Sequence, residues 1–443
     1  MYRRAFLAGA AAFAARKAVG ANETLRIGLI GCGGRGRYVA GLMSQAPGIQ
    51  FAAVCDVYDA NRERARSWAG NGAQAYSDFR RVLERKDLDA VLVATPDHWH
   101  AIITMLACES GKHVYTEKPL AYSVREGRAM VTAARRYKRV VQAGTQHRSA
   151  PHFAELAQLV RGGGLGAIAF VRVWNYVNIF PGGIGHAADG PAPPGLDWDF
   201  WLGPAPKVPY NPLRCLTTFR FFRDYAGGTI TDFGTHRFDT VHQIMGPDKP
   251  KSVMAVGGRF VLKDDGDVPD TMQVIYEYPG WVLSYECSSI NGHGLGGRTP
   301  GMRYYNARGA DDRPHGMAFY GTKGTLIADR IGYDLYPPDP RYGFGGVKTP
   351  SQPIGGAPRK WMNTTDATAA HTRNFVDAIR TGAPPACDVE TGHRATLVAH
   401  LGNIALRAGR KLEWDSETES FPGQPDANAM LYREPRRPWS IPG

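Results

Sequence analysis

Short apolar runs alternate with amphipathic stretches in the first third of the chain. The runs have the length and composition of buried strands, and they lie at 25–30, 51–55, 88–94, 113–116 and 140–144. The stretches between them carry apolar residues at helical spacing and predict helices at 38–45, 60–68, 78–85, 101–110 and 123–137. Strands that alternate with helices of this size predict an α/β fold built on a doubly wound parallel sheet.

The pattern changes after about residue 147. Three runs alternate apolar and polar residues with period two, which predicts antiparallel strands with one covered face, at 171–176, 272–278 and 281–286. The segments 371–380 and 391–407 predict late helices that close the structure. We therefore expect one domain at 22–146 and a second α/β domain, with a mostly antiparallel sheet, at 147–443.

The first predicted strand runs directly into a glycine-rich loop, Gly31-x-Gly33-x-x-Gly36, and a helix follows. This context is typical of a Rossmann-type dinucleotide site. Gly31 permits the tight turn, Gly33 lets the backbone approach a pyrophosphate, and Gly36 lets the helix pack close to the strand. The free N–H groups at the helix start favour phosphate. Gly34 and Arg35, inside the loop, belong to the same predicted cofactor site.

An acidic residue at the end of the second strand indicates which dinucleotide binds. The carboxylate of Asp56 would accept hydrogen bonds from the adenosine ribose hydroxyls, and its charge would repel a 2′-phosphate. NAD is therefore the expected cofactor. Arg62 and Arg64 lie nearby and could bind a 2′-phosphate, which leaves NADP open as the alternative.

Composition and charge narrow the function classes. The 443 residues are 43% hydrophobic and 21% charged, which suits a globular protein of two or three domains. The net charge is +12, but the basic residues are scattered and no nucleic-acid-binding motif accompanies them, so no nucleic-acid partner is expected. No apolar run is long enough to span a bilayer, so no membrane partner is expected either. The histidines at 98, 100 and 147 lack a further ligand at metal-site spacing, so no metal is expected.

Residues 1–21 resemble a twin-arginine export signal. Arg3-Arg4-Ala5-Phe6-Leu7 precedes an alanine-rich stretch, and Ala18-Val19-Gly20-Ala21 offers small residues for cleavage. The alternative is a basic, alanine-rich helix that stays attached. Export would place the protein in the periplasm, and the twin-arginine route carries folded proteins. Because NAD is a cytoplasmic molecule, we expect a tightly held cofactor that is recycled in place.

Four motifs in a fixed order resemble the Gfo/Idh/MocA oxidoreductases. They are Gly31-x-Gly33-x-x-Gly36, Thr95-Pro96-x-x-x-His100, Glu117-Lys118-Pro119 and Gly227-Gly228-x-x-x-Asp232-x-x-x-His236. The resemblance covers nearly the whole chain. It implies an NAD(P)-binding domain, then an α/β domain whose large open sheet often forms an oligomer interface, so a dimer or tetramer is expected. It also implies sugars, polyols or glycosides as substrates.

The resemblance assigns roles to three residues. Lys118 is the central lysine, near both the nicotinamide and the substrate hydroxyl. Asp232 and His236 are four residues apart and so share one helix face, which the resemblance aims at the substrate. His236 would be the general base or acid, and Asp232 would bind a substrate hydroxyl. A histidine has a suitable pKa for proton transfer, but Lys118 could also share the proton, and the sequence leaves that choice open.

Further residues complete the predicted site. The resemblance implies that the cofactor is lined by Thr95, Pro96, His98, His100 and Glu117, with Gln146 at the nicotinamide end. Aromatic faces stack on sugars and arginines bind hydroxyl groups, so the predicted substrate residues also include Arg148, Trp174, Tyr176 and Arg223. Each of these four could equally belong to the core or to an interface.

Three functions fit the sequence. The first is an NAD(P)-dependent oxidoreductase that acts on a secondary hydroxyl of a sugar, polyol or glycoside. The second is an NAD-dependent glycoside hydrolase or lyase that works by transient oxidation and elimination. The glycosidase branch tends to lack the lysine of Glu-Lys-Pro, and the presence of Lys118 favours the first function. The third is a non-catalytic sensor, against which the set Lys118, Asp232 and His236 counts.

Overall fold

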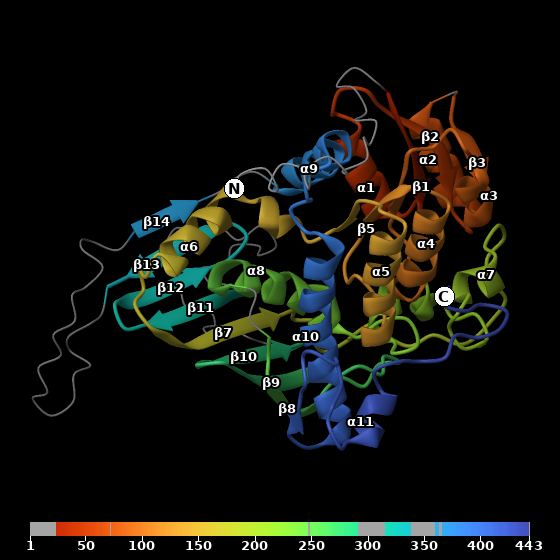
Figure 1. Cartoon of the computed structure of the whole chain (residues 1–443). Helices are drawn as coiled ribbons and strands as arrows, with labels where there is room; N and C mark the ends of the chain where they lie inside the picture. The colour runs from red at the N-terminus through yellow and green to blue at the C-terminus, as the bar shows by residue number, and fades with distance from the viewer. Residues whose placement is uncertain are drawn as a thin grey trace, which may run out of the picture.

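The computed structural model describes residues 24–70, 72–246, 249–290, 315–337, 359–362 and 366–442, the segment 359–362 by its backbone alone. The predicted export signal at 1–21 lies outside these residues. Two sheets, each with its own helices, lie next to each other (Figure 1). Among the described helices, none combines the length and the apolar character that a membrane crossing needs.

The first sheet has six parallel strands in the order β3-β2-β1-β4-β5-β6. They are β1 (Leu25–Ile30), β2 (Ile49–Cys55), β3 (Gln74–Tyr76), β4 (Ala90–Val93), β5 (His113–Thr116) and β6 (Val141–Ala143). This confirms the predicted doubly wound parallel sheet. Successive strands are added outward from β1 to β3 on one side of the sheet and outward from β4 to β6 on the other. This change between the neighbours β1 and β4 leaves a crevice at their carboxyl ends.

The helices of this sheet begin earlier than predicted at two places. They are α1 (Gly34–Met43), α2 (Asp59–Ala69), α3 (Phe79–Glu84), α4 (Asp97–Glu109) and α5 (Val124–Arg136). Helix α1 starts inside the glycine loop, and α4 starts directly after Pro96. Glycine and polar residues weaken the apolar periodicity in both first turns, which is why the sequence pattern missed them. As a result, His98 and His100 lie on a helix and not in a loop.

The second sheet has nine strands in the order β14-β13-β12-β11-β7-β10-β9-β8-β15. They are β7 (Ile168–Tyr176), β8 (Ser252–Gly258), β9 (Thr271–Tyr278), β10 (Trp281–Ser288), β11 (His315–Gly321), β12 (Gly324–Ala328), β13 (Gly332–Tyr336), β14 (Arg359–Met362) and β15 (Leu412–Glu413). Strands β7 and β10 pair in parallel, and the other pairs are antiparallel. The predicted mostly antiparallel open sheet is therefore confirmed.

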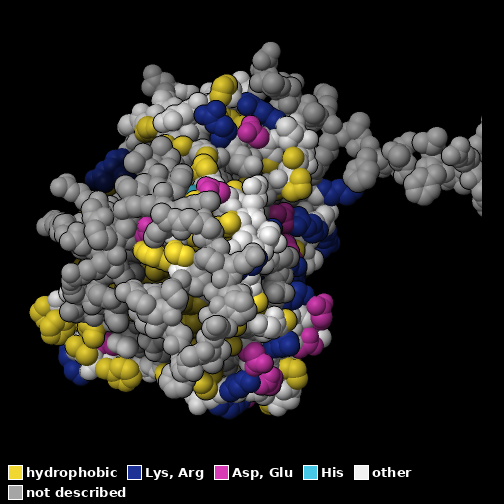
Figure 2. Space-filling view, turned by 90° about the vertical axis from the view of Figure 1, so that its left-hand side faces the viewer, with side chains coloured by type: hydrophobic (Ala, Val, Ile, Leu, Met, Phe, Trp, Pro, Cys, Tyr) yellow, Lys and Arg dark blue, Asp and Glu magenta, His cyan; other side chains and the backbone are white. Residues whose placement is uncertain are grey.

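Helices lie over one face of the second sheet (Figure 1): α6 (Pro151–Arg161), α8 (Thr235–Met245) and α10 (Val389–Ala408). Alternate residues of each strand pack toward them, as Val171 and Val173 do in β7. The opposite face exposes between 36% and 63% of six large apolar side chains, namely Phe170, Met254, Val256, Ile275, Val282 and Tyr320. Hydrophobic side chains are also visible along the lower part of the molecule in Figure 2.

The remaining helices and turns complete the list of elements. They are the 3-10 turns η1 (Gln146–Ser149), η2 (Pro212–Arg214) and η3 (Thr218–Phe221), the π turn η4 (Ile230–Gly234), and the helices α7 (Trp198–Leu202), α9 (Thr368–Thr381) and α11 (Pro425–Ala429). Helix α9 packs on α1, and its Phe375 and Val376 join the apolar core that contains Leu25 and Ile27 of β1. The late part of the chain thus completes the core of the first domain.

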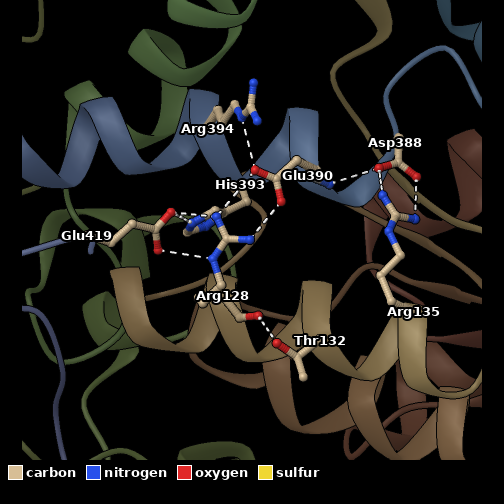
Figure 3. Close-up of polar contacts among 8 residues, drawn as sticks. All are labelled: Arg128, Thr132, Arg135, Asp388, Glu390, His393, Arg394 and Glu419. Carbon is tan, nitrogen blue, oxygen red and sulfur yellow. Dashed lines mark hydrogen bonds and ion pairs between the residues drawn. The ribbon is translucent and has the colours of Figure 1, made fainter. Parts of the chain in front are cut away.

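An ion-pair network joins α5 of the first domain to α10 of the second (Figure 3). The guanidinium of Arg128 binds the carboxylates of both Glu390 and Glu419. His393 Nε2 lies 2.9 Å from Glu419 Oε1, which ties the same cluster back to α10. Nearer the start of α10, Arg135 pairs with Asp388. Charged contacts and apolar packing therefore both hold the two domains together.

Candidate active site

A cavity of about 440 Å³ lies at the carboxyl ends of β1, β2 and β4. Its position is the point at which open α/β sheets bind ligands. Seven of the predicted cofactor residues line this nucleotide crevice, namely Gly31, Gly33, Gly34, Arg35, Asp56, Thr95 and Pro96.

The glycine loop has the shape that a pyrophosphate needs. Gly31 has a φ of +89°, and a Cβ there would lie 2.6 Å from the carbonyl of Ala94. A Cβ at Gly36 would lie 2.0 Å from the carbonyl oxygen of Gly31, so helix and strand can pack this closely only with glycine. A Cβ at Gly33 or Gly34 would meet nothing within 4 Å. The start of α1 therefore faces open room that fits a dinucleotide phosphate.

Asp56 is fixed at the end of β2. Its carboxylate accepts hydrogen bonds from the main-chain N–H groups of Cys32 at 2.7 Å and Tyr58 at 2.8 Å. The side chain is thereby held where a ribose would lie. Arg64 lines the crevice, whereas the guanidinium of Arg62 lies 2.6 Å from the carboxylate of Asp59.

The predicted catalytic lysine and aspartate meet. The ammonium of Lys118 forms an ion pair with the carboxylate of Asp232 and donates to the main-chain oxygen of Asp232 at 2.9 Å. Arg220 Nε donates to the same carboxylate at 3.0 Å. Burial favours the neutral acid, but these two cations outweigh it and lower the pKa of Asp232 to about 2. Asp232 is therefore an anion that holds Lys118 in place.

Asp232 and His236 do not lie on one regular helix. Asp232 belongs to the π turn η4, and His236 follows in the first turn of α8. The wider turn directs Asp232 toward Lys118, while the ring of His236 lies beside that of His147, with 4.7 Å between the centroids. Such π turns are frequent at functional sites.

His236 and His147 are both neutral. Burial, and then neighbouring positive groups, hold the pKa of each ring well below its ordinary value. In the described part of the chain, Nδ1 of His236 and both ring nitrogens of His147 have no hydrogen-bond partner. Buried polar atoms normally have partners, so these nitrogens are available to a ligand. A neutral imidazole can accept a proton.

Most of the remaining predicted cofactor residues form polar contacts with other protein groups around the crevice. Glu117 pairs with Arg35 Nε at 2.9 Å. The ring of His100 lies 2.8 Å from the carbonyl oxygen of Pro119 and 2.9 Å from that of Thr95, and His98 lies 3.1 Å from the carbonyl oxygen of Trp201. Neither histidine lines the crevice. Gln146 is buried in η1, and its Oε1 finds no partner among the described residues.

The four additional substrate residues stay a prediction, and the structure shows where each of them lies. Arg148 is bound to Asp239 of α8 at 2.6 Å. Trp174 and Tyr176 lie on the face of the second sheet away from α8, because strand residues alternate between faces and Val173 faces the helices. Arg223 lines a different cavity.

Sequence reasoning missed four polar residues of this region. Arg220 lies in a short 3-10 turn that has no periodic signal, and His147 was considered only as a metal ligand. Asp97 is buried at the start of α4, and its burial raises its pKa to about 7. The amide of Asn175, on the helix-facing side of β7, has no partner within the described residues. Among the described residues, no cluster of three or more metal-ligating side chains occurs.

Comparison with known proteins gives matches across both domains. Residues 25–145 match the model described as oxidoreductase family, NAD-binding Rossmann fold, and residues 168–279 and 355–441 match the model of the C-terminal alpha/beta domain of the same family. Myo-inositol 2-dehydrogenase of Thermotoga maritima is 23% identical over 397 residues, which are 88% of this chain and 98% of that protein.

Two further likenesses bear on the site. A glycosyl hydrolase family 109 protein of Saccharopolyspora erythraea is 36% identical over 127 residues, 27% of this chain and 28% of that protein. The solved structure of levoglucosan dehydrogenase, in complex with NADH and levoglucosan, aligns over 88% of this chain and 99% of that one, with a TM-score of 0.65 and 20% identity. At this identity the structural likeness supports the fold.

Proposed function

The chain belongs to the Gfo/Idh/MocA family of oxidoreductases, and from this premise we propose that it oxidises a secondary hydroxyl group of a sugar, polyol or glycoside with NAD. The observation that carries the proposal is the meeting of Lys118 with Asp232 beside the nucleotide crevice, with His236 in the next helical turn. Two of the relatives named above, myo-inositol 2-dehydrogenase and levoglucosan dehydrogenase, are named for polyol and sugar substrates.

Each residue has a task in this reaction. Bound NAD would supply the ring that accepts a hydride. The main-chain N–H groups at Gly33 and Gly34 would bind its pyrophosphate, and Asp56 would bind its ribose. Lys118, held by Asp232, orients the substrate hydroxyl and stabilises the negative charge that develops on its oxygen. The neutral imidazole of His236 accepts the hydroxyl proton. The unpartnered polar atoms of His147 and Asn175 would bind neighbouring hydroxyl groups.

A second candidate function is NAD-dependent glycoside hydrolysis or elimination. The glycosyl hydrolase family 109 relative favours it, although the match covers only about a quarter of each chain. The two functions differ in their products. We expect a panel of glycosides to reduce the nucleotide without release of free sugar. Sugar release without net nucleotide reduction would instead establish the hydrolase, and the absence of both signals would indicate a sensor.

We also propose that the cofactor is retained through export to the periplasm. Residues 195–220, here called the strap, supply seven of the residues that line the crevice. The strap is hydrogen-bonded to the first domain, from Asp59 N to Gly195 O at 2.8 Å and from Asp197 N to Val57 O at 3.0 Å. Trp439, near the end of the chain, stacks on Phe200 of the strap with 5.5 Å between the ring centroids. A nucleotide under the strap would leave slowly.

Export and retention are tested together. Protein purified from the periplasm should release a stoichiometric amount of NAD on denaturation. The variant with Arg3→Lys and Arg4→Lys should stay in the cytoplasm with the same nucleotide content. Purified protein that holds no nucleotide and binds NAD weakly would contradict retention, and unchanged export of the twin-lysine variant would contradict the twin-arginine route.

A homo-oligomer, a dimer or a tetramer, is the third part of the proposal. The apolar side chains on the open face of the second sheet would lie in its interface, because large exposed apolar patches usually mark contact surfaces. Replacement of Val256 by Glu should dissociate the oligomer, as measured by light scattering, whereas Val261→Glu serves as a control outside the sheet. A wild-type monomer would refute this assignment.

A further inference from the structure

A second large cavity is lined in part by Ala226 and Gly227, in the turn that precedes Asp232. Its volume is about 480 Å³, and it shares no lining residue with the nucleotide crevice. It is bounded by the start of α5, the second half of α10, the end of α11 and the chain near Arg223. A cavity of this size fits a molecule of the dimensions of a monosaccharide. We call it the arginine groove, after its residues Arg223, Arg407 and Arg433.

Two of the three arginines have no internal partner. Among the described residues, the guanidinium groups of Arg223 and Arg407 form no hydrogen bond and no ion pair. The main-chain N–H of Arg223 donates to the carboxylate of Asp267 at 2.8 Å, and the charge of Arg223 opposes the rise that burial causes in the pKa of Asp267. Both side chains also line an adjoining cavity of about 400 Å³, so both stand at the boundary between the two hollows. Two guanidinium groups that form no ion pair therefore face the same space.

The third arginine is held rigidly. Arg433 Nη1 donates to the hydroxyl of Tyr122 at 2.9 Å and to the carbonyl oxygen of Asp224 at 2.8 Å. Its guanidinium also lies 4.0 Å from the centre of the Tyr122 ring. These contacts involve one of its terminal nitrogens and one face of the planar group. Arg433 thus forms a fixed positive wall of the groove.

Negative charge in the groove is scarce. Asp224 is the one acidic residue among its described lining residues, and its carboxylate is paired with Arg214 at 3.0 Å. The start of α5 also reaches the groove, but Ser123 and Glu126 form a capping box that already binds N–H groups there. The positive charge that faces the cavity therefore comes from the arginines.

We propose that the arginine groove binds a small organic anion whose carboxylate or phosphate group lies between Arg223 and Arg407. Guanidinium groups bind both oxyanions through paired N–H donors. Tyr432 and Asn403, which also line the groove, offer polar contacts to the uncharged part of such a ligand. The groove is separate from the redox site, so the proposal stands or falls independently of the proposed oxidation.

Calorimetric titration of the full chain tests the groove. Saturating NAD is present so that the phosphate-binding glycine loop is filled. The probes are D-glucuronate, D-glucose 6-phosphate, inorganic phosphate and, as the neutral comparison, D-glucose. We expect at least one anion to bind with a Kd in the millimolar range or tighter. The double variant Arg223→Gln/Arg407→Gln should raise that Kd by about tenfold or more. D-glucose has no charge for the arginines to bind, so any binding of D-glucose at the redox site should be unchanged in this double variant.

The matched control removes two other exposed arginines, in the double variant Arg66→Gln/Arg81→Gln, and should bind as the wild type does. Binding of glucuronate alone would assign the ligand as a carboxylate, and binding of the phosphates alone as a phosphate ester. If the glutamine variant folds poorly, Arg223→Lys/Arg407→Lys keeps the charge, loses the paired donors and should still weaken binding. The proposal is overturned if no anion binds, if the double variant weakens the binding of D-glucose as much as that of the anion, or if test and control variants behave alike.

Discussion

The side chain of Lys118 forms an ion pair with Asp232, a residue 114 positions later in the chain. The lysine follows strand β5 of the first domain, and the aspartate lies in the π turn before α8 of the second. Arg220 binds the same carboxylate from a third segment. The proposed catalytic centre therefore exists only when both domains are docked.

Replacement of Lys118 by Met should abolish hydride transfer and spare cofactor binding. The variant loses the ammonium group that orients the hydroxyl and stabilises charge on its oxygen, so we expect a loss of more than about 100-fold in single-turnover nucleotide reduction. The Kd for NAD should stay within about twofold, because the crevice is lined by other residues. Lys86→Met, on an exposed lysine, is the control. An active Lys118→Met enzyme would refute the assignment.

Arg220→Gln should make activity sensitive to acid. Lys118 and Arg220 lower the pKa of Asp232 to about 2, so in the wild type this carboxylate stays charged down to that pH. Removal of one cation lets burial raise the pKa, and Lys118 then loses its anionic partner as the pH falls. We expect the acid limb of the kcat profile to move upward by about one pH unit or more. An unchanged profile would mean that Arg220 does not set the charge of Asp232.

Two alanine substitutions in the glycine loop should have different effects. Gly36→Ala places a methyl group 2.0 Å from the carbonyl oxygen of Gly31, so the chain should unfold at a markedly lower temperature. Gly33→Ala meets nothing within 4 Å in the protein, so the melting temperature without nucleotide should hardly change. Its methyl group would instead occupy the space of the pyrophosphate and weaken NAD binding. Calorimetric melting and NAD titration separate the two effects, and equal behaviour would contradict the loop geometry.

Arg128→Ala should loosen the contact between α5 and α10. The guanidinium binds two carboxylates in a half-buried network, and its loss leaves Glu390 and Glu419 with fewer counter-ions (Figure 3). We expect the free energy of unfolding to fall by about 1 kcal/mol in denaturant titrations. Arg81→Ala, which removes an exposed pair with Glu84, is the control and should change it by a few tenths at most. Equal losses of unfolding free energy in the two variants would show that the network stabilises the protein no more than a single surface ion pair does.

The sequence patterns were informative where apolar runs and motifs coincide. The strands at 25–30 and 113–116 agree with β1 and β5 in both bounds, because each is buried and followed by a polar or glycine-rich break. Strand β3 escaped notice because it has three residues, none of them buried. Strand β15, at the edge of the second sheet, has only two residues, which is too short for an alternation to be recognised.

The sequence predicts the candidate-site residues that belong to motifs, and it does not indicate those that lie in irregular segments. Period two in β7 separates Trp174 from Val173, but it does not indicate which of the two faces the helices cover, so the sequence leaves the surroundings of Trp174 open. Arg220 depends on the path of the strap, which follows no periodicity. Arg148 could be read as a ligand for a sugar, because the sequence does not show that Asp239 lies against it.

Helix α9 carries a practical consequence for dissecting the molecule. Phe375 and Val376 fill the core beside β1, although they lie more than 200 positions beyond the last strand of the first sheet. A fragment of residues 22–146 would therefore leave an uncovered apolar flank on its sheet. Nucleotide affinity measured on such a truncated piece would describe a damaged protein, and the excision of a free-standing dinucleotide module would require the late helix to be supplied with it.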